Sequence, residues 1–113
     1  MHEYSIVQAL LEKVHAEARA HGALSVARVS IRLGELSGVE PDLLARAYET
    51  FREEGPCAGA PLHIAHVPAR WECVACQEPI ARGAVLACPR CGRSARLAEG
   101  DEIVLDRVEL EVA

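Results

Sequence analysis

The chain has 113 residues, half of them hydrophobic, and a formal net charge of −5 at pH 7. This size and composition allow one compact core, and the acidic balance argues against a nucleic-acid surface built from clustered Lys and Arg. No stretch approaches the roughly 20 apolar residues of a membrane-spanning helix, and the apolar run 6–11 lacks the preceding basic residue of a secretory signal. We therefore expect a cytoplasmic protein whose cysteines are reduced.

The first predicted element is an amphipathic helix over residues 3–21, with Gly22 as its stop. Its apolar side chains recur at helical spacing: Ile6, Val7, Leu10, Leu11, Val14 and Ala18. A strand follows in "VARVSIRLGEL", where every second residue from 29 to 33 is apolar. This alternation predicts a half-buried strand with one face in water.

The loop "GELSGVEP" leads into a second predicted helix, which starts at Pro41 and ends at Gly55. The connector "PCAGAP" then precedes a short strand, "LHIAHV". A final strand in "EIVLDRVELEV" changes its apolar phase near Asp106, which predicts a β-bulge there.

The order of these elements predicts an α+β fold: two helices on a three-stranded sheet, with a four-cysteine zinc-ribbon module inserted between the last two strands. We expect residues 1–70 and 100–113 to form an α/β domain. Residues 71–99, the cysteine module, would form a zinc-binding domain.

The cysteine module contains two Cys-x-x-Cys pairs, Cys73 with Cys76 and Cys88 with Cys91, separated by eleven residues. Two such turns can direct four thiolates at one point, the arrangement that zinc prefers. A pair of redox dithiols is the alternative, but a thioredoxin-like dithiol is expected beside a βαβ pattern. Because four protein ligands leave no open coordination position, the predicted zinc ion is structural.

Gly92 and Cys57 have separate interpretations. Gly92 directly follows Cys91 and suits a turn that curls around a sulfur atom. Cys57 lies outside both pairs and is interpreted as an unpaired residue in a turn rather than as a fifth ligand.

The chain begins Met1-His2-Glu3, which offers an α-amino group, a backbone amide and an imidazole within one short segment. These nitrogens can close two fused chelate rings in a plane, and such coordination suits Ni(II) and Cu(II). Glu3 adds a carboxylate as a further ligand or a supporting partner. The site requires that Met1 is retained. Taken alone, a histidine at the second position is ordinarily a solvated terminal residue.

Three segments, "MHEYSIVQALL", "RLGELSGVEPDLLARAYE" and "CVAC…CPRCG", together resemble the HypA/HybF family of hydrogenase nickel-incorporation proteins. The resemblance implies a metallochaperone, not an enzyme, that transports Ni(II) and contains a structural Zn(II). It implies nickel ligands at Met1, His2 and Glu3, within a nickel-binding domain of residues 1–70 and 100–113. The implied zinc ligands are Cys73, Cys76, Cys88 and Cys91.

The same resemblance implies partners. These are a nickel-handling GTPase, the large subunit of NiFe hydrogenase and, in some bacteria, urease accessory proteins; neither nucleic acid nor membrane is implied. The chain departs from many relatives at Pro56 and Cys57 and in its short spacer between the cysteine pairs, but at no implied ligand.

Other interpretations fit parts of the sequence. A zinc-ribbon adaptor that binds nucleic acid or a protein would use the module's four arginines between residues 82 and 96, although aromatic residues for base stacking are scarce. A zinc hydrolase would need a His-Glu-x-x-His segment, which the sequence lacks. Glu40 is either an extra oxygen ligand for nickel or a charge at the helix start. The remaining histidines are interpreted as outside the site: His15, His21, His63 and His66.

Overall fold

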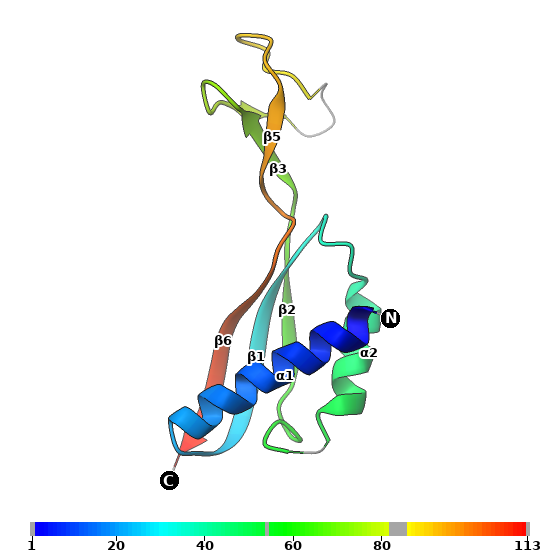
Figure 1. The fold of residues 1–113 in the computed structure, drawn as a ribbon, viewed down its shortest axis with the longest axis vertical. Coiled ribbons are helices and arrows are strands. Elements are labelled where there is room, and N and C mark those ends of the chain that lie inside the picture. The colour runs from blue at the N-terminus through cyan, green and yellow to red at the C-terminus, as the bar shows by residue number, and fades with distance from the viewer. Residues whose placement is uncertain (1, 54, 82–85, 113) are drawn as a thin grey trace.

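The structure is a computed structural model that describes residues 2–53, 55–81 and 86–112, with His2 described as backbone only. The molecule is elongated, 57 × 28 × 16 Å, with two helices in one half and a small sheet at the opposite end (Figure 1). The first sheet has the strand order β2-β1-β6 and consists of Leu62–Val67, Ala23–Gly34 and Ile103–Val112. The second has the order β4-β3-β5 and consists of Pro79–Ile80, Arg70–Cys73 and Ala95–Glu99. The predicted α+β fold is confirmed, including the insertion before the last strand.

Helices α1 (His2–Ala20) and α2 (Pro41–Phe51) cover the same face of the first sheet (Figure 1). The bounds of α1 agree with the predicted helix to within one residue. Helix α2 ends at Phe51 instead of reaching Gly55, because the chain folds back there and the Arg52 guanidinium donates a hydrogen bond to the Ala60 carbonyl oxygen at 2.8 Å. Neither helix, as far as the chain is described, is long and apolar enough to cross a membrane.

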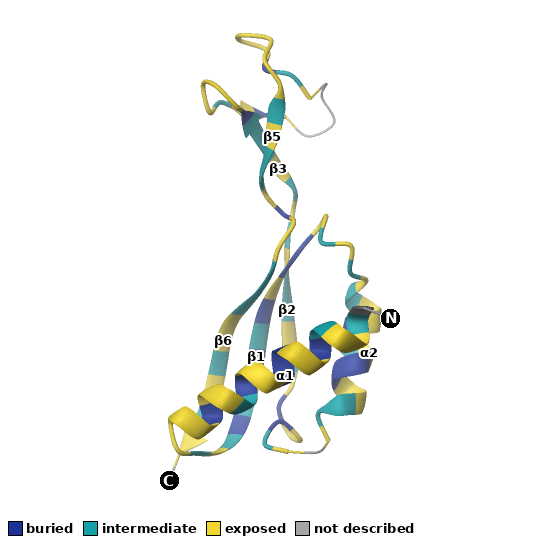
Figure 2. Cartoon of the chain, in the orientation of Figure 1, coloured by how far each residue is buried: buried dark blue, intermediate teal, exposed yellow. Residues whose placement is uncertain are grey.

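The hydrophobic core lies between the helices and the first sheet. The sheet-facing side of α1 is buried and its outer side is exposed (Figure 2), as the helical spacing predicted. The alternation in β1 is also confirmed, since Val29, Ile31 and Leu33 are at most 1% exposed. Tyr48 of α2 is fully buried, and its hydroxyl donates a hydrogen bond to the Ala60 carbonyl oxygen at 2.8 Å, so its polar end is satisfied.

The two ladders of the first sheet differ in regularity. Strand β1 pairs in parallel with β2, without interruption from Val29↔Leu62 to Gly34↔Val67. It pairs antiparallel with β6, and this ladder contains register shifts. One shift leaves Asp106 between the partners of Ser30 and Ile31, which confirms the predicted bulge.

A contact between backbones joins the two sheets. Gly34 lies so close to Gly100 that a Cβ atom on Gly34 would overlap the Gly100 carbonyl group. Gly100 has a φ of +109°, and a Cβ atom there would lie 2.6 Å from the Cα atom of Ala69. The Leu36 N–H donates to the Gly100 carbonyl at 2.6 Å, and the Glu35 carboxylate accepts from the Ala69 N–H at 2.8 Å. The loop after β1 is therefore fastened to both chain segments that connect the sheets.

Candidate metal centres

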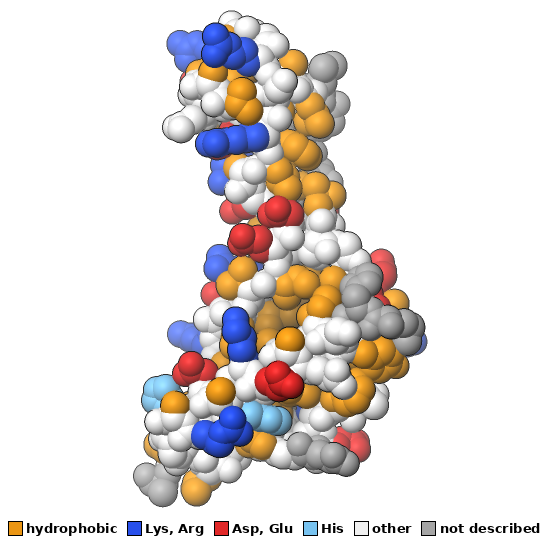
Figure 3. Space-filling view, in the orientation of Figure 1, with side chains coloured by type: hydrophobic (Ala, Val, Ile, Leu, Met, Phe, Trp, Pro, Cys, Tyr) orange, Lys and Arg blue, Asp and Glu red, His pale blue; other side chains and the backbone are white. Residues whose placement is uncertain are grey.

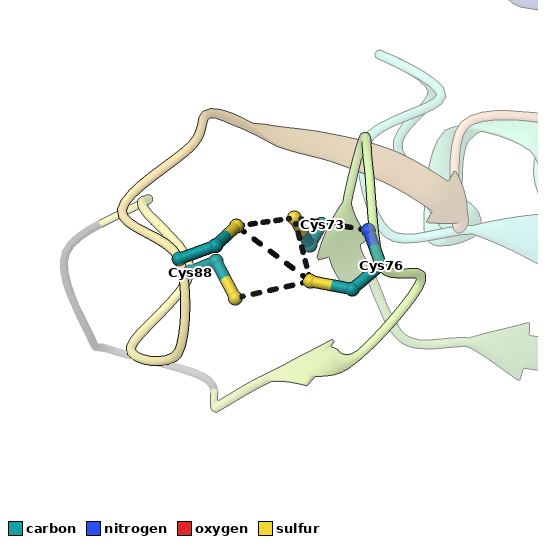
Figure 4. Close-up of side chains that lie close together, drawn as sticks. Cys73, Cys76 and Cys88 are labelled. Carbon is teal, nitrogen blue, oxygen red and sulfur yellow. Dashed lines mark hydrogen bonds between the residues drawn. The ribbon is translucent and has the colours of Figure 1, made fainter.

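Two short turns bring the four predicted zinc ligands together. Cys73 ends β3 and Cys76 follows it, whereas Cys88 and Cys91 lie between β4 and β5. The four sulfur atoms all lie within 4.8 Å of one another. The Cys76 sulfur is 3.4 Å from that of Cys73 and 3.6 Å from those of Cys88 and Cys91 (Figure 4).

These separations fit a tetrahedral zinc ion. Four sulfurs at about 2.3 Å from zinc lie roughly 3.8 Å apart, whereas a disulfide needs about 2.05 Å. Four of the six sulfur–sulfur distances are 3.4 to 3.6 Å, close to the first value, and the cysteines are free thiols. A site completed by four sulfurs leaves no position for water, so the cluster fits structural and not hydrolytic zinc.

Backbone N–H groups point at one sulfur of each pair. The N–H groups of Cys76 and Ala75 lie 3.5 and 3.4 Å from the Cys73 sulfur and lower the pKa of that thiol to about 6. The N–H groups of Cys91 and Arg90 likewise lower the pKa of Cys88. Since zinc binds thiolates, each turn supplies one sulfur that loses its proton readily.

The two cysteine turns have the same backbone geometry. The Gln77 N–H donates to the Cys73 carbonyl at 3.1 Å, and the Gly92 N–H donates to the Cys88 carbonyl at 2.8 Å. Gln77 and Gly92 both have left-handed backbones, with φ values of +59° and +74°. The role of Gly92 was predicted from its position, whereas the sequence gives no sign that Gln77 adopts the same conformation.

Ion pairs offset much of the positive charge of the cysteine module. Arg96 pairs with Glu72 at 2.6 Å, and Arg90 pairs with Glu78 at 2.9 Å. Figure 3 shows basic side chains, which are arginines, at the tip of the module and acidic side chains below them. This distribution is unlike the continuous basic surface that binds a phosphate backbone.

Two of the predicted nickel ligands, His2 and Glu3, belong to the first turn of α1. Met1 and the His2 side chain lie outside the described structure, while Glu3 is half-buried in the first helical turn. The next residue, Tyr4, makes an edge-to-face contact with Phe51, with ring centroids 5.4 Å apart and planes at 86°. This contact holds the start of α1 against the end of α2. Glu40 is the exposed N-cap of α2, and its side chain makes no capping hydrogen bond.

The other histidines join no cluster of three or more potential ligands among the described residues. His63 and His66 are exposed on β2, three positions apart in an uninterrupted ladder, so they point to opposite faces as predicted. His21 is exposed, and its ring contacts the Glu17 carbonyl oxygen at 2.9 Å.

Cys57 is fully buried, although it lies in the predicted turn and outside the four-sulfur cluster. Burial raises the pKa of its thiol, which therefore stays protonated at neutral pH. The turn is anchored at Ala60, whose carbonyl oxygen accepts hydrogen bonds from Tyr48 and Arg52, both at 2.8 Å. Sequence reasoning missed this packing because a short turn shows no periodic spacing of apolar residues.

Comparisons with known proteins agree with this architecture. Residues 1–110 match the model of the HypA family, described as "Hydrogenase/urease nickel incorporation, metallochaperone". Hydrogenase maturation factor HypA of Shewanella oneidensis is 43% identical over 115 aligned positions, covering 100% of this chain and 98% of that protein. The corresponding factor of Nitrosospira multiformis is 41% identical, covering 97% of each chain.

Solved structures show the same relationship. The solution structure of the Ni metallochaperone HypA from Helicobacter pylori matches with a TM-score of 0.74 and 30% identity, over 98% of each chain. A second solution structure of a HypA protein matches with a TM-score of 0.83 and 31% identity, over 100% of this chain and 98% of the other. This chain therefore belongs to the HypA family.

Proposed function

We propose that this chain is a nickel metallochaperone that binds Ni(II) at Met1, His2 and Glu3 and delivers it to the large subunit of NiFe hydrogenase. The observation that carries the proposal is the match to a nickel-incorporation family over residues 1–110, which includes a terminal segment with suitable donor atoms. A carrier makes and breaks no covalent bond in its cargo, so no enzymatic activity is proposed. Zinc at Cys73, Cys76, Cys88 and Cys91 would have a purely structural role.

The chemistry of a helix start supports nickel binding there. The first N–H groups of a helix have no acceptor within the helix, so the His2 amide can release its proton to solvent and bind a metal through its nitrogen without loss of a helical hydrogen bond. An α-amino group with a pKa near 8 gives up its proton at neutral pH with little cost. Amine, amide and imidazole nitrogens then form the planar set that Ni(II) favours, with the Glu3 carboxylate beside them.

The same location favours release. The positive end of the helix dipole opposes a bound cation by up to about 1 kcal/mol. A terminal turn also opens more easily than the helix interior. A carrier must let its cargo go, and both effects weaken the hold of the first turn of α1 on nickel.

We further propose that residues 1–70 and 100–113 act as the nickel-binding domain and residues 71–99 as the zinc-binding domain, in the cytosol. The proposed partners are a nickel-handling GTPase and the hydrogenase large subunit, since close relatives are named as hydrogenase maturation factors. The family description also names urease, so urease accessory proteins are proposed as further partners.

Nickel titration of the untagged, zinc-loaded protein tests the site. We expect one Ni(II) ion per chain besides zinc, and complete loss of that ion in His2→Ala with zinc retained. His21→Ala is the matched control, because His21 lies just beyond the same helix and is exposed. Unchanged nickel affinity in His2→Ala would rule out the proposed site.

Extension of the chain ahead of Met1 tests the role of the terminal amine. It converts the amine into an amide and should weaken nickel binding while zinc stays bound. Titration with duplex DNA distinguishes the proposed metallochaperone from a zinc-ribbon adaptor that binds nucleic acid. If the protein bound DNA in a salt-dependent way, and if neither His2→Ala nor the extension ahead of Met1 changed nickel binding, the adaptor interpretation would be favoured.

A further inference from the structure

Strand β2 forms one edge of the first sheet, and no other strand of the described chain pairs with its outer side. Odd-numbered residues of this segment bond to β1; for example, the Glu35 N–H donates to the Val67 carbonyl at 2.9 Å. Backbone groups alternate in direction along a strand. The N–H and C=O groups of Leu62, Ile64 and His66 therefore point away from β1, and this row is termed the β2 edge.

The β2 edge lacks charged side chains and bulges, two features with which proteins commonly prevent strand addition. Its ladder to β1 has no register shift, and residues 62–67 include no Lys, Arg, Asp or Glu. The opposite edge strand, β6, is bulged at Asp106 and carries charged side chains at residues 106, 107, 109 and 111. Charge and bulges are the common protections of an exposed edge, so β6 is protected and β2 is open.

A hollow of about 490 Å³ opens beside the end of the β2 edge. His66 lines it and lies on the same, helix-facing side of the strand as Ile64, which packs on the core. Most of the other lining is apolar and comes from β1, the start of α2 and the segment after β2: Leu33, Gly34, Val39, Pro41, Val67 and Pro68. Two exposed glutamates, Glu35 and Glu40, also line it.

We propose that the β2 edge and this hollow form a docking site for an extended segment of a partner protein that carries aliphatic and basic side chains. The segment adds to the sheet as a strand next to β2. Its residue opposite His66 points to the same face of the sheet and enters the hollow. Backbone hydrogen bonds then give affinity, and the hollow selects the side chain.

Charge complementarity identifies the basic character of the occupant. Glu40 places a carboxylate at the hollow beside that of Glu35, which also accepts the hydrogen bond from the Ala69 N–H, and the whole chain has a formal net charge of −5. A Lys or Arg on the same face of the added strand, two positions from the aliphatic residue, meets these carboxylates. The proposal does not depend on nickel binding.

The test uses the full zinc-loaded chain and a capped peptide, Thr-Val-Thr-Lys-Thr-Val-Thr, whose valine and lysine side chains share one face when extended. We expect peptide-dependent shifts in the ¹⁵N NMR spectrum confined to residues 62–68 and the lining of the hollow. Hydrogen exchange of the Leu62, Ile64 and His66 amides should slow by at least about tenfold at saturation. Replacement of the peptide lysine by glutamate should weaken binding about tenfold or more.

Two matched variants locate the site. His66→Lys adds a positive charge at the hollow and should weaken peptide binding by about tenfold, whereas His63→Lys should change it by less than about twofold. Both side chains are exposed on the same strand, and only His66 lines the hollow. Equal effects of the two variants, or peptide-induced protection of β6 instead of β2, would overturn the proposal. Concentration-dependent protection of the β2 edge without peptide would overturn it in favour of a second copy of this chain.

Discussion

The two sheets of this chain are stabilised by different interactions. The first sheet, with α1 and α2, encloses a continuous apolar core whose buried and partly buried members extend from Ile6 to Leu110 in sequence. The described part of the cysteine module buries only Cys73, Ile80 and Cys88 among its hydrophobic residues (Figure 2). A segment this small cannot offset its conformational entropy by apolar burial, so the module depends on metal.

The two metals that we propose for this chain would differ in the same way. Four sulfurs on two turns with fixed backbone donors would hold zinc permanently, with an apparent binding free energy of about 10–16 kcal/mol, as in small zinc peptides. A terminal segment at the start of α1 would hold nickel only until transfer. Stability and release are thus assigned to two separate parts of one elongated molecule, the cysteine module and the start of α1, and they can be disturbed separately.

The largest expected effect comes from Cys73→Ser, which removes the thiolate that accepts two backbone N–H groups. We expect loss of zinc and loss of amide protection in residues 70–99, with the helical circular dichroism of α1 and α2 retained. Metal analysis and hydrogen exchange measure these outcomes. Cys57→Ser is the control, because Cys57 lies outside the cluster and its replacement should leave zinc bound. Loss of amide protection in both sheets together would contradict the conclusion that the two sheets are stabilised by different interactions.

Leu44→Ala is the opposite change, because it creates a cavity in the core of the first sheet. Leu44 is fully buried, so we expect the free energy of unfolding to fall by about 2–5 kcal/mol while the zinc content stays unchanged. Denaturant unfolding and metal analysis give both quantities. The neighbouring Leu43 is 47% exposed, and Leu43→Ala should cost much less. Similar losses in both variants would mean that α2 is not packed as described.

Gly100→Ala tests the junction between the sheets. The added Cβ atom would meet the Ala69 backbone, and a φ of +109° strains any residue with a side chain. We therefore expect the free energy of unfolding to fall by about 2 kcal/mol or more. Residual dipolar couplings should report a changed orientation of the two sheets. Gly38→Ala is the matched control, since Gly38 has a φ of +79° but open space around its Cβ position. If both variants behave alike, strain alone and not the contact explains the effect.

The features predicted correctly from sequence are those that a local pattern encodes. The helical spacing of apolar residues predicted α1 to within one residue. The alternation of apolar residues predicted the buried face of β1, and a change in its phase predicted the bulge at Asp106. The convergence of the four sulfurs followed from the spacing of the two cysteine pairs.

The features that sequence reasoning missed depend on contacts between distant segments. The small sheet of β3, β4 and β5 has strands of only two to five residues, too short for a visible period. The contact between Gly34 and Gly100 joins residues far apart in the chain, and each glycine alone resembles an ordinary turn residue. Gln77 takes a left-handed backbone because the cysteine turn requires it, not because glutamine favours it.

Gln77 and Gly92 provide the finest test of the cysteine module. Gly92→Ala places a side chain at a φ of +74° and should cost about 1–2 kcal/mol, which weakens zinc binding roughly 5- to 30-fold. Gln77→Gly relieves the same strain in the other turn and should tighten zinc binding by less than about fivefold, because glycine gains entropy in the unfolded chain. Competition with a chromophoric chelator measures both zinc affinities.

Gly22→Ala is the control for backbone strain. It has comparable strain at a φ of +62° next to α1, and it should destabilise the first sheet without a change in zinc affinity. Because a Cβ atom on Gly92 would meet nothing within 4 Å, unchanged zinc affinity in Gly92→Ala would show that the turn relaxes and that its left-handed residue is not required for metal binding.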